Sequence, residues 1–197
     1  MKPISRARTL PSTSYRNAKS VTSHTAACDV VAAPTTFAGW VYAAFILDVC
    51  SRRVVGWQLS TSLGTDLALD ALNIGLWTRA HDGRDTSALV HRPVEPGQYV
   101  AASYTERLAE AGVVASVGSK GDSYDNAMAE AFNSLFKAEL VRNRGPWKNI
   151  DDLEIAVAEY IDWFNFRRLH GELGLIPPVE YEALHGSYNL IGATGAA

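Results

Sequence analysis

Two apolar, β-rich segments lie close together, at residues 40–48 (WVYAAFILD) and 53–60 (RVVGWQLS). Only residues 49–52 separate them, which is a connection short enough for an antiparallel hairpin. A strand pair of this kind predicts a β-sheet at the centre of the fold. The segments after the hairpin then decide how that sheet is completed and covered.

Helical and strand-like segments alternate after the hairpin. We expect helices at 65–80, with Thr65 as its cap, and at 103–111, with Ser103 as its cap, then at 125–142 and from Asp151 or Asp152 to 168. Short strands are expected at 87–91 and 113–117, and the two prolines within 92–97 predict irregular structure there. This order predicts an α/β fold with a mixed sheet flanked by helices, and it suits an RNase H-like layout. That layout needs one more strand before the hairpin, which only residues 28–36 can supply.

Composition limits the function classes without choosing one. The chain has 197 residues, with 18 basic and 21 acidic side chains and a net charge of −3, so charge alone does not indicate a DNA-binding protein. Its only cysteines, Cys28 and Cys50, exclude a disulfide scaffold and a cysteine-based zinc site. No apolar run reaches membrane-spanning length, and no secretion signal is evident, so we expect a cytoplasmic protein.

Four segments are predicted along the chain. Residues 1–28 contain five basic and no acidic side chains, which predicts a disordered leader; a transit peptide and a basic arm on DNA are the alternatives. Residues 29–145 form the predicted core. A C-terminal helical extension comes next, at 146–185, and residues 186–197 form a flexible tail.

One segment concentrates polar chemistry, at residues 118–130 (GSKGDSYDNAMAE). It predicts a glycine-rich loop followed by a helix start, where Asp125 or Asn126 caps the helix. Asn126, Glu130, Asn133 and Lys137 then share one helix face. A carboxylate one turn into a helix, beside a flexible loop, is well placed to bind a metal ion. The alternative is an ordinary solvated face.

The sequence resembles bacterial insertion-element transposases whose catalytic core is related to retroviral integrase. The matching segments occur in the family's order over about residues 37–183. They include 45–57 (FILDVCSRRVVGW), 65–72 (TDLALDAL), 104–112 (YTERLAEAG), 118–130, 145–147 (GPW) and 161–169 (IDWFNFRRL). Several of these segments are long and mutually spaced, which makes the resemblance specific.

The resemblance implies DNA strand cleavage and transfer during transposition. Family members use two Asp and one Glu to bind two divalent ions, Mg²⁺ or Mn²⁺. Glu130 matches the family's Glu within the motif DNAMAE. Contacts to DNA phosphates are expected from Lys120, Asn126, Asn133 and Lys137. The implied partners are the element ends and the target DNA, with a second copy of the chain or an intact transposase.

The second Asp of the family is missing here. It belongs about 35 residues before the Glu, and counting back from Glu130 places Val94 there. Valine cannot bind a metal ion. The adjacent Glu95 could replace the missing carboxylate only after a register change, because successive side chains on a strand point in opposite directions.

The position of the first Asp is open between two neighbours. Ungapped alignment places Val30 there, and Asp29 fits after a slip of one residue. Asp48 is a further carboxylate, at the end of the hairpin strand, and is expected to have a structural role. We therefore predict Glu130 and Asp29 as the catalytic, metal-binding pair in a core that has lost most or all activity. The alternatives are a non-catalytic DNA- or transposase-binding remnant and a relic that does not fold.

Overall fold

The computed structural model describes residues 25–36, 39–84, 86, 90–93, 102–115 and 123–186. Within them, side chains of 25–36, 90–93, 115, 123–126 and 186 are not described. Residues 1–24 of the predicted leader, the tail from residue 187, Lys120, Val94 and Glu95 lie outside the described residues.

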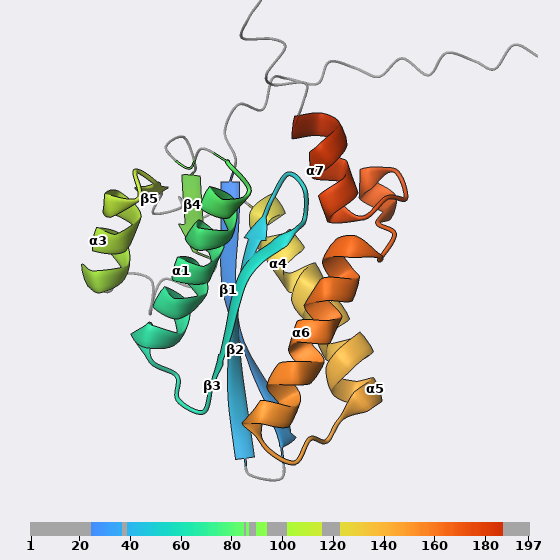
Figure 1. Ribbon diagram of the computed structural model, residues 1–197. Coiled ribbons are helices and arrows are strands. Elements are labelled where there is room, and N and C mark those ends of the chain that lie inside the picture. Colours follow the sequence, from blue (N-terminus) through green and yellow to red (C-terminus); the bar gives the residue numbers. More distant parts are fainter. Residues whose placement is uncertain are drawn as a thin grey trace, which may run out of the picture.

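A five-stranded mixed sheet forms the centre of the structure (Figure 1). Its order is β3 (Val54–Ser60), β2 (Gly39–Asp48), β1 (Thr25–Thr36), β4 (Val90–Pro93) and β5 (Val114–Ala115). Strands β1, β2 and β3 form two antiparallel pairs, whereas β4 and β5 continue the sheet in parallel. This confirms the predicted RNase H-like layout. The extra strand exists and begins at Thr25, so the boundary of the predicted leader at residue 28 is too late.

Strand β4 differs from its prediction because it includes Arg92 and Pro93, which were expected to be irregular. β5 pairs only with Val90 and His91, so at Pro93 the described partner of β4 is β1 alone. A proline is tolerated where a strand has a neighbour on one side only, because its missing N–H breaks no ladder bond on the open side.

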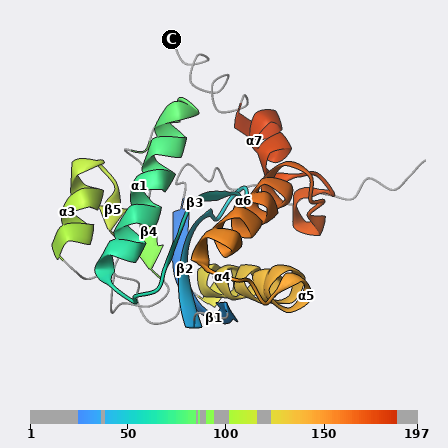
Figure 2. The ribbon, with the colours of Figure 1, turned by 60° about the horizontal axis from the view of Figure 1, so that its bottom comes forward.

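Helices cover both faces of the sheet, as Figures 1 and 2 show. α1 (Thr65–His81) and α3 (Ala102–Glu110) lie on one face. α4 (Ser123–Phe136) and α6 (Ile150–Phe166) lie on the other, together with a π-helical turn, η1 (Lys137–Val141), and the short α5 (Arg142–Arg144). None of the described helices is long and apolar enough to cross a membrane.

Several predicted helix caps are wrong by one or two residues. The N-cap of α1 is Gly64, with no side-chain cap, and Ser103 lies inside α3 because that helix already begins at Ala102. Asn149 caps α6 by accepting a hydrogen bond from the Asp152 N–H at 2.9 Å. Asp152 is therefore in the first turn, where a negative charge also interacts favourably with the helix dipole.

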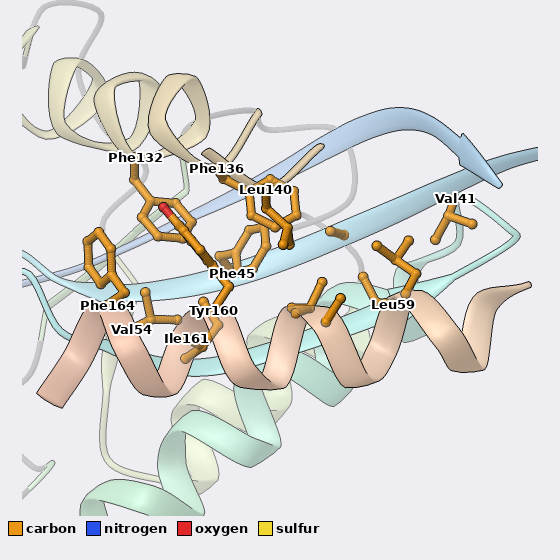
Figure 3. Close-up of a cluster of buried hydrophobic side chains, with 14 of the residues drawn as sticks. Val41, Phe45, Val54, Leu59, Phe132, Phe136, Leu140, Tyr160, Ile161 and Phe164 are labelled. Atoms are coloured by element: carbon orange, nitrogen blue, oxygen red, sulfur yellow. The ribbon is translucent and has the colours of Figure 1, made fainter. Parts of the chain in front are cut away.

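The larger core lies between the sheet and the α4–α6 layer (Figure 3). The ring of Phe45 on β2 packs edge-on against Phe132 and Phe136 of α4, with centroid distances of 4.9 and 5.0 Å. Phe132 in turn contacts Phe164 of α6 at 5.1 Å. Such edge-to-face contacts add about 0.5–1.5 kcal/mol per pair to the apolar area that they bury. This aromatic cluster fixes α4, and with it Glu130, against the sheet.

On the opposite face of the sheet, the backbones of α1 and β3 come into close contact. A Cβ added at Gly56 of β3 would lie 2.2 Å from the Ala71 carbonyl oxygen of α1, so only glycine permits this approach. Buried residues fill the rest of this layer: Ala44, Ile46, Val55, Leu67, Ala68, Leu72, Tyr104 and Leu108.

A further helix lies at the end of the predicted C-terminal extension. After the short 3₁₀ turn η2 (Gly171–Leu173), helix α7 (Pro178–Gly186) begins at the second of two adjacent prolines. α7 packs near the C-terminal end of α6 (Figure 1). The local sequence pattern gave no separate helix after residue 168, although this stretch belongs to the predicted helical extension.

Candidate functional site

Helix α4 presents Glu130 to solvent. The helix begins at Ser123, so Asp125 and Asn126 lie in its first turn and the prediction that one of them is the cap is wrong. Glu130 is exposed, whereas Met128, Ala129 and Phe132 face the core. Among the described residues, no side chain forms an ion pair with Glu130.

The residues of the predicted polar face differ in exposure. Lys137 is half-buried and begins the π turn, and Asn133 is buried at 8% exposure, so this face is not fully solvated. Asn126 lies on the helix, but its side chain is among those not described, and Lys120 lies outside the described residues. Of the four residues predicted to share one helix face, the structure describes the side chains of Glu130, Asn133 and Lys137.

The backbone around the predicted carboxylates is defined by two ladders. Asp29 of β1 pairs with Phe45 of β2 in the antiparallel ladder. On its other side, β1 pairs in parallel with β4, and the last described pair joins Cys28 and Pro93. Val94 is the next residue after Pro93 in the sequence, and the side chain of Asp29 is among those not described.

A complete metal-binding cluster is not found in the described part of the chain. No group of three His, Cys, Asp or Glu side chains there lies close enough to hold an ion. Glu130 is thus the one predicted metal ligand whose side chain the structure describes.

Asp48 belongs to a buried ionic cluster, which agrees with its expected structural role. Its carboxylate binds Arg79 of α1 at 2.7 Å, and Arg79 also binds Glu182 of α7 at 2.8 Å. Glu182 further accepts hydrogen bonds from Ser51 at 2.6 Å and from Arg53 at 2.9 Å. We call these five residues the α7 clamp, because they tie α7 to the β2–β3 turn and to the end of α1.

Charge compensation sets the protonation states in the α7 clamp. Burial alone would raise the pKa of Glu182, but hydrogen bonds from Arg79, Ser51 and Arg53 outweigh it and lower this pKa to about 2. Burial likewise opposes the charge of Arg79, yet the neighbouring Glu182 and Asp48 raise its pKa. Both groups therefore stay charged at neutral pH. The clamp was missed in the sequence because its members are spread from the hairpin to α7.

A second polar cluster joins the π turn to α6. Glu139 of η1 accepts a hydrogen bond from the Tyr160 hydroxyl at 2.9 Å and forms an ion pair with Arg168. The Arg168 guanidinium also lies over the Trp163 ring, 5.3 Å from its centroid. Burial, followed by the charge of Glu139, raises the pKa of Tyr160, so this hydroxyl stays protonated and donates.

Comparison with known proteins shows what the chain is similar to. Residues 111–178, which include α4 and Glu130, match the Integrase core domain family. The predicted resemblance to insertion-element transposases and to retroviral integrases is confirmed.

The chain has relatives among insertion-sequence proteins. It is 44% identical over 152 residues to a putative transposase for insertion sequence element IS986/IS6110 of Mycobacterium tuberculosis, covering 77% of this chain and 55% of that protein. It is 48% identical over 148 residues to the transposase for insertion sequence element IS629 of Shigella sonnei, covering 75% of this chain and 48% of that protein. The chain thus spans about half the length of these curated relatives.

Solved structures confirm the fold of the chain. The HTLV-2 integrase catalytic core domain, solved in complex with magnesium, matches with a TM-score of 0.61 at 12% identity, over 80% of this chain and 95% of that chain. The catalytic core domain of BIV integrase matches with a TM-score of 0.58 at 14% identity, over 84% of this chain and 98% of that chain. At these identities the likeness concerns the fold alone.

Proposed function

We propose that this chain is the integrase-core part of an insertion-element transposase that binds DNA but lacks the carboxylate set needed to cut and join it. The observation that carries this proposal is that Val94 stands at the counted position of the second Asp, while the exposed Glu130 on α4 is retained inside the region that matches the Integrase core domain family. Its relatives among insertion-sequence transposases support DNA as the partner. A second copy of the chain or an intact transposase is the protein partner we propose, in the cytoplasm.

We assign the first Asp position to Asp29. Residues directly opposite each other in an antiparallel ladder belong to the same face of the sheet. Position 29 is opposite Phe45, whose ring packs on α4, whereas position 30 is opposite Ala44, which belongs to the α1 layer. This register supports Asp29 over Val30 as the residue on the face that carries Glu130.

The residues do not fit a two-ion site. Divalent ions such as Mg²⁺ require several oxygen ligands, mainly carboxylates. The counted position of the second Asp is Val94, which offers no oxygen, and the described side chains supply no group of three ligands. We therefore propose no cleavage step for this chain.

Binding of DNA phosphates by side chains does not require the metal ions. Lys137, the first residue of η1, is half-buried and lies on the same side of the helix as Glu130. Asn126 and Lys120 are assigned to the same surface by sequence, whereas the buried Asn133 is less accessible to DNA. Amide and ammonium groups bind phosphate oxygens without reading the base sequence. An active enzyme is the competing proposal, and the retained Glu130 favours it.

Restoring the missing carboxylate tests the proposal. Purified wild-type protein, Val94→Asp and Val94→Asp/Glu130→Gln are incubated with supercoiled plasmid and Mn²⁺, and nicked circles are counted. We expect no nicking by the wild type, nicking by Val94→Asp, and loss of that nicking in the double variant, because the two carboxylates act on the same ions. Nicking by the wild type that disappears in Glu130→Gln would show an active enzyme instead. If Val94→Asp binds DNA but does not nick the plasmid, the missing carboxylate is not the cause of the lost activity.

A further inference from the structure

The helix that carries Glu130 does not end at Phe136. It continues through the π turn η1 into α5, as the backbone shows: the Arg142 N–H donates to the Lys137 carbonyl, five residues earlier. Such a turn holds one residue more than an α-helical turn, so every later side chain is rotated by about 100° relative to a continuous α-helix.

This rotation decides which basic side chain joins the Glu130 side of the helix. In a continuous α-helix, Lys137 lies about 20° from Glu130 and Arg142 about 120° away. The extra residue in η1 brings Arg142 back to about 20° from Glu130 and turns Arg144 away from that line. The contacts agree, since Arg144 pairs with Glu159 of α6 at 3.3 Å.

The π turn is held in place by its own contacts. Glu139 lies within it and is bound both by the Tyr160 hydroxyl and by Arg168. Tyr160 belongs to α6 and to the aromatic core, and Arg168 follows α6. These contacts therefore hold η1 in one rotation about the helix axis. Arg142 is exposed, and among the described residues no acceptor binds its guanidinium.

We propose that Arg142 is a further DNA-phosphate contact, positioned by the π turn so that it continues the line of Glu130 and Lys137. The proposal rests on the DNA-binding function above. Four α-helical steps separate Lys137 and Arg142 after allowance for the extra residue, a rise of about 6 Å, which lets both side chains reach phosphates of the same DNA strand. Arginine suits this role because its guanidinium binds phosphate through two parallel hydrogen bonds.

The test measures the salt dependence of binding to a fluorescent duplex of random sequence. Wild-type full chain is compared with Arg142→Gln and with Arg144→Gln, which removes the same charge from a side chain paired with Glu159. A third variant, Arg142→Asn/Asn143→Arg, keeps the composition and net charge and moves the cation by about 100° around the helix. Thermal unfolding of each variant shows whether it is folded.

Loss of one phosphate contact lowers the slope of log K against log salt by about 0.9. Between 50 and 200 mM salt, the wild type should therefore lose about 3.5-fold more affinity than Arg142→Gln. The exchange variant should behave like Arg142→Gln, and Arg144→Gln like the wild type. Equal slopes for Arg142→Gln and Arg144→Gln, or an unchanged slope in the exchange variant, would overturn the role of Arg142 while DNA binding stands. A folded wild type that does not bind the duplex would overturn both proposals.

Discussion

The α7 clamp makes stability depend on pH through Glu182, and the size of the effect can be worked out. An ordinary Glu titrates near 4.3, whereas hydrogen bonds from Arg79, Ser51 and Arg53 outweigh burial and lower the pKa of Glu182 to about 2. A difference of about 2.3 units corresponds to about 3 kcal/mol of folding free energy at neutral pH. Since the Glu182 side chain is only 11% exposed, little of this is screened by solvent.

The sign of the effect is set by a folded-state pKa that lies below the unfolded one. The contribution is fully present above about pH 5 and is lost as the pH falls towards 2, because the unfolded chain takes up the proton first. Glu182→Gln cannot carry the charge. The wild type should therefore exceed this variant in unfolding free energy by about 3 kcal/mol at pH 7 and by about half of that at pH 3.

Urea unfolding followed by tryptophan fluorescence measures both values. Glu180→Gln is the matched control, because Glu180 is on the same helix and exposed. Its difference from the wild type should stay small at both pH values. If the difference between the wild type and Glu182→Gln is the same at pH 7 and pH 3, Glu182 does not titrate as the clamp requires.

Three substitutions test the packing that positions the site. Gly56→Ala places a methyl group against the Ala71 carbonyl, so we expect a loss of about 1–3 kcal/mol in urea unfolding, and an unchanged midpoint would refute the close contact. Asn165→Leu removes both hydrogen bonds to the Val54 backbone, at 3.0 and 2.8 Å, and should cost about 2–4 kcal/mol by the same measurement; a neutral result would mean that water replaces them. Phe45→Ala should cost about 3–5 kcal/mol and shift the near-ultraviolet circular dichroism of the aromatic core, and a variant with wild-type stability would contradict the packing of α4 on β2.

The hairpin and the main helices were predictable because local patterns determine them. The alternation of helical and strand-like segments gave β2, β3, α1 and the long helix α6 to within a few residues. β1 was the weakest prediction although it is the central strand. Its short side chains show no alternation, and its place is set by pairing with β2 and β4, which are distant in sequence.

Helix α7 lies in the predicted helical extension at 146–185 but was not predicted as a separate helix, because two adjacent prolines ordinarily interrupt a helix. Pro178 is instead the first residue of the helix. At that position the missing N–H has no helical partner to lose, and the fixed φ of proline suits the helix. Glu182 then holds the helix through contacts to residues about 100 positions earlier, which no local pattern can indicate.

The candidate site was predictable as far as Glu130 and less so beyond it. The motif at residues 118–130 gave the helix and its carboxylate, and the strand register then favoured Asp29 over Val30. The π turn was not predicted, since the spacing of Phe136 and Leu140 fits a continuous α-helix. The π turn is instead held by contacts of Glu139 with Tyr160 and Arg168, which are distant in sequence and leave no local pattern.

Calorimetric titration of Mn²⁺ tests the central claim most directly, namely that Glu130 belongs to a metal site that Val94 leaves incomplete. The wild type, Val94→Asp and Val94→Asp/Glu130→Gln are titrated under the same conditions. Val94→Asp should bind Mn²⁺ at least about tenfold more tightly than either of the others, because the number of carboxylates sets the affinity of such a site. Equal affinity in all three proteins would contradict the claim.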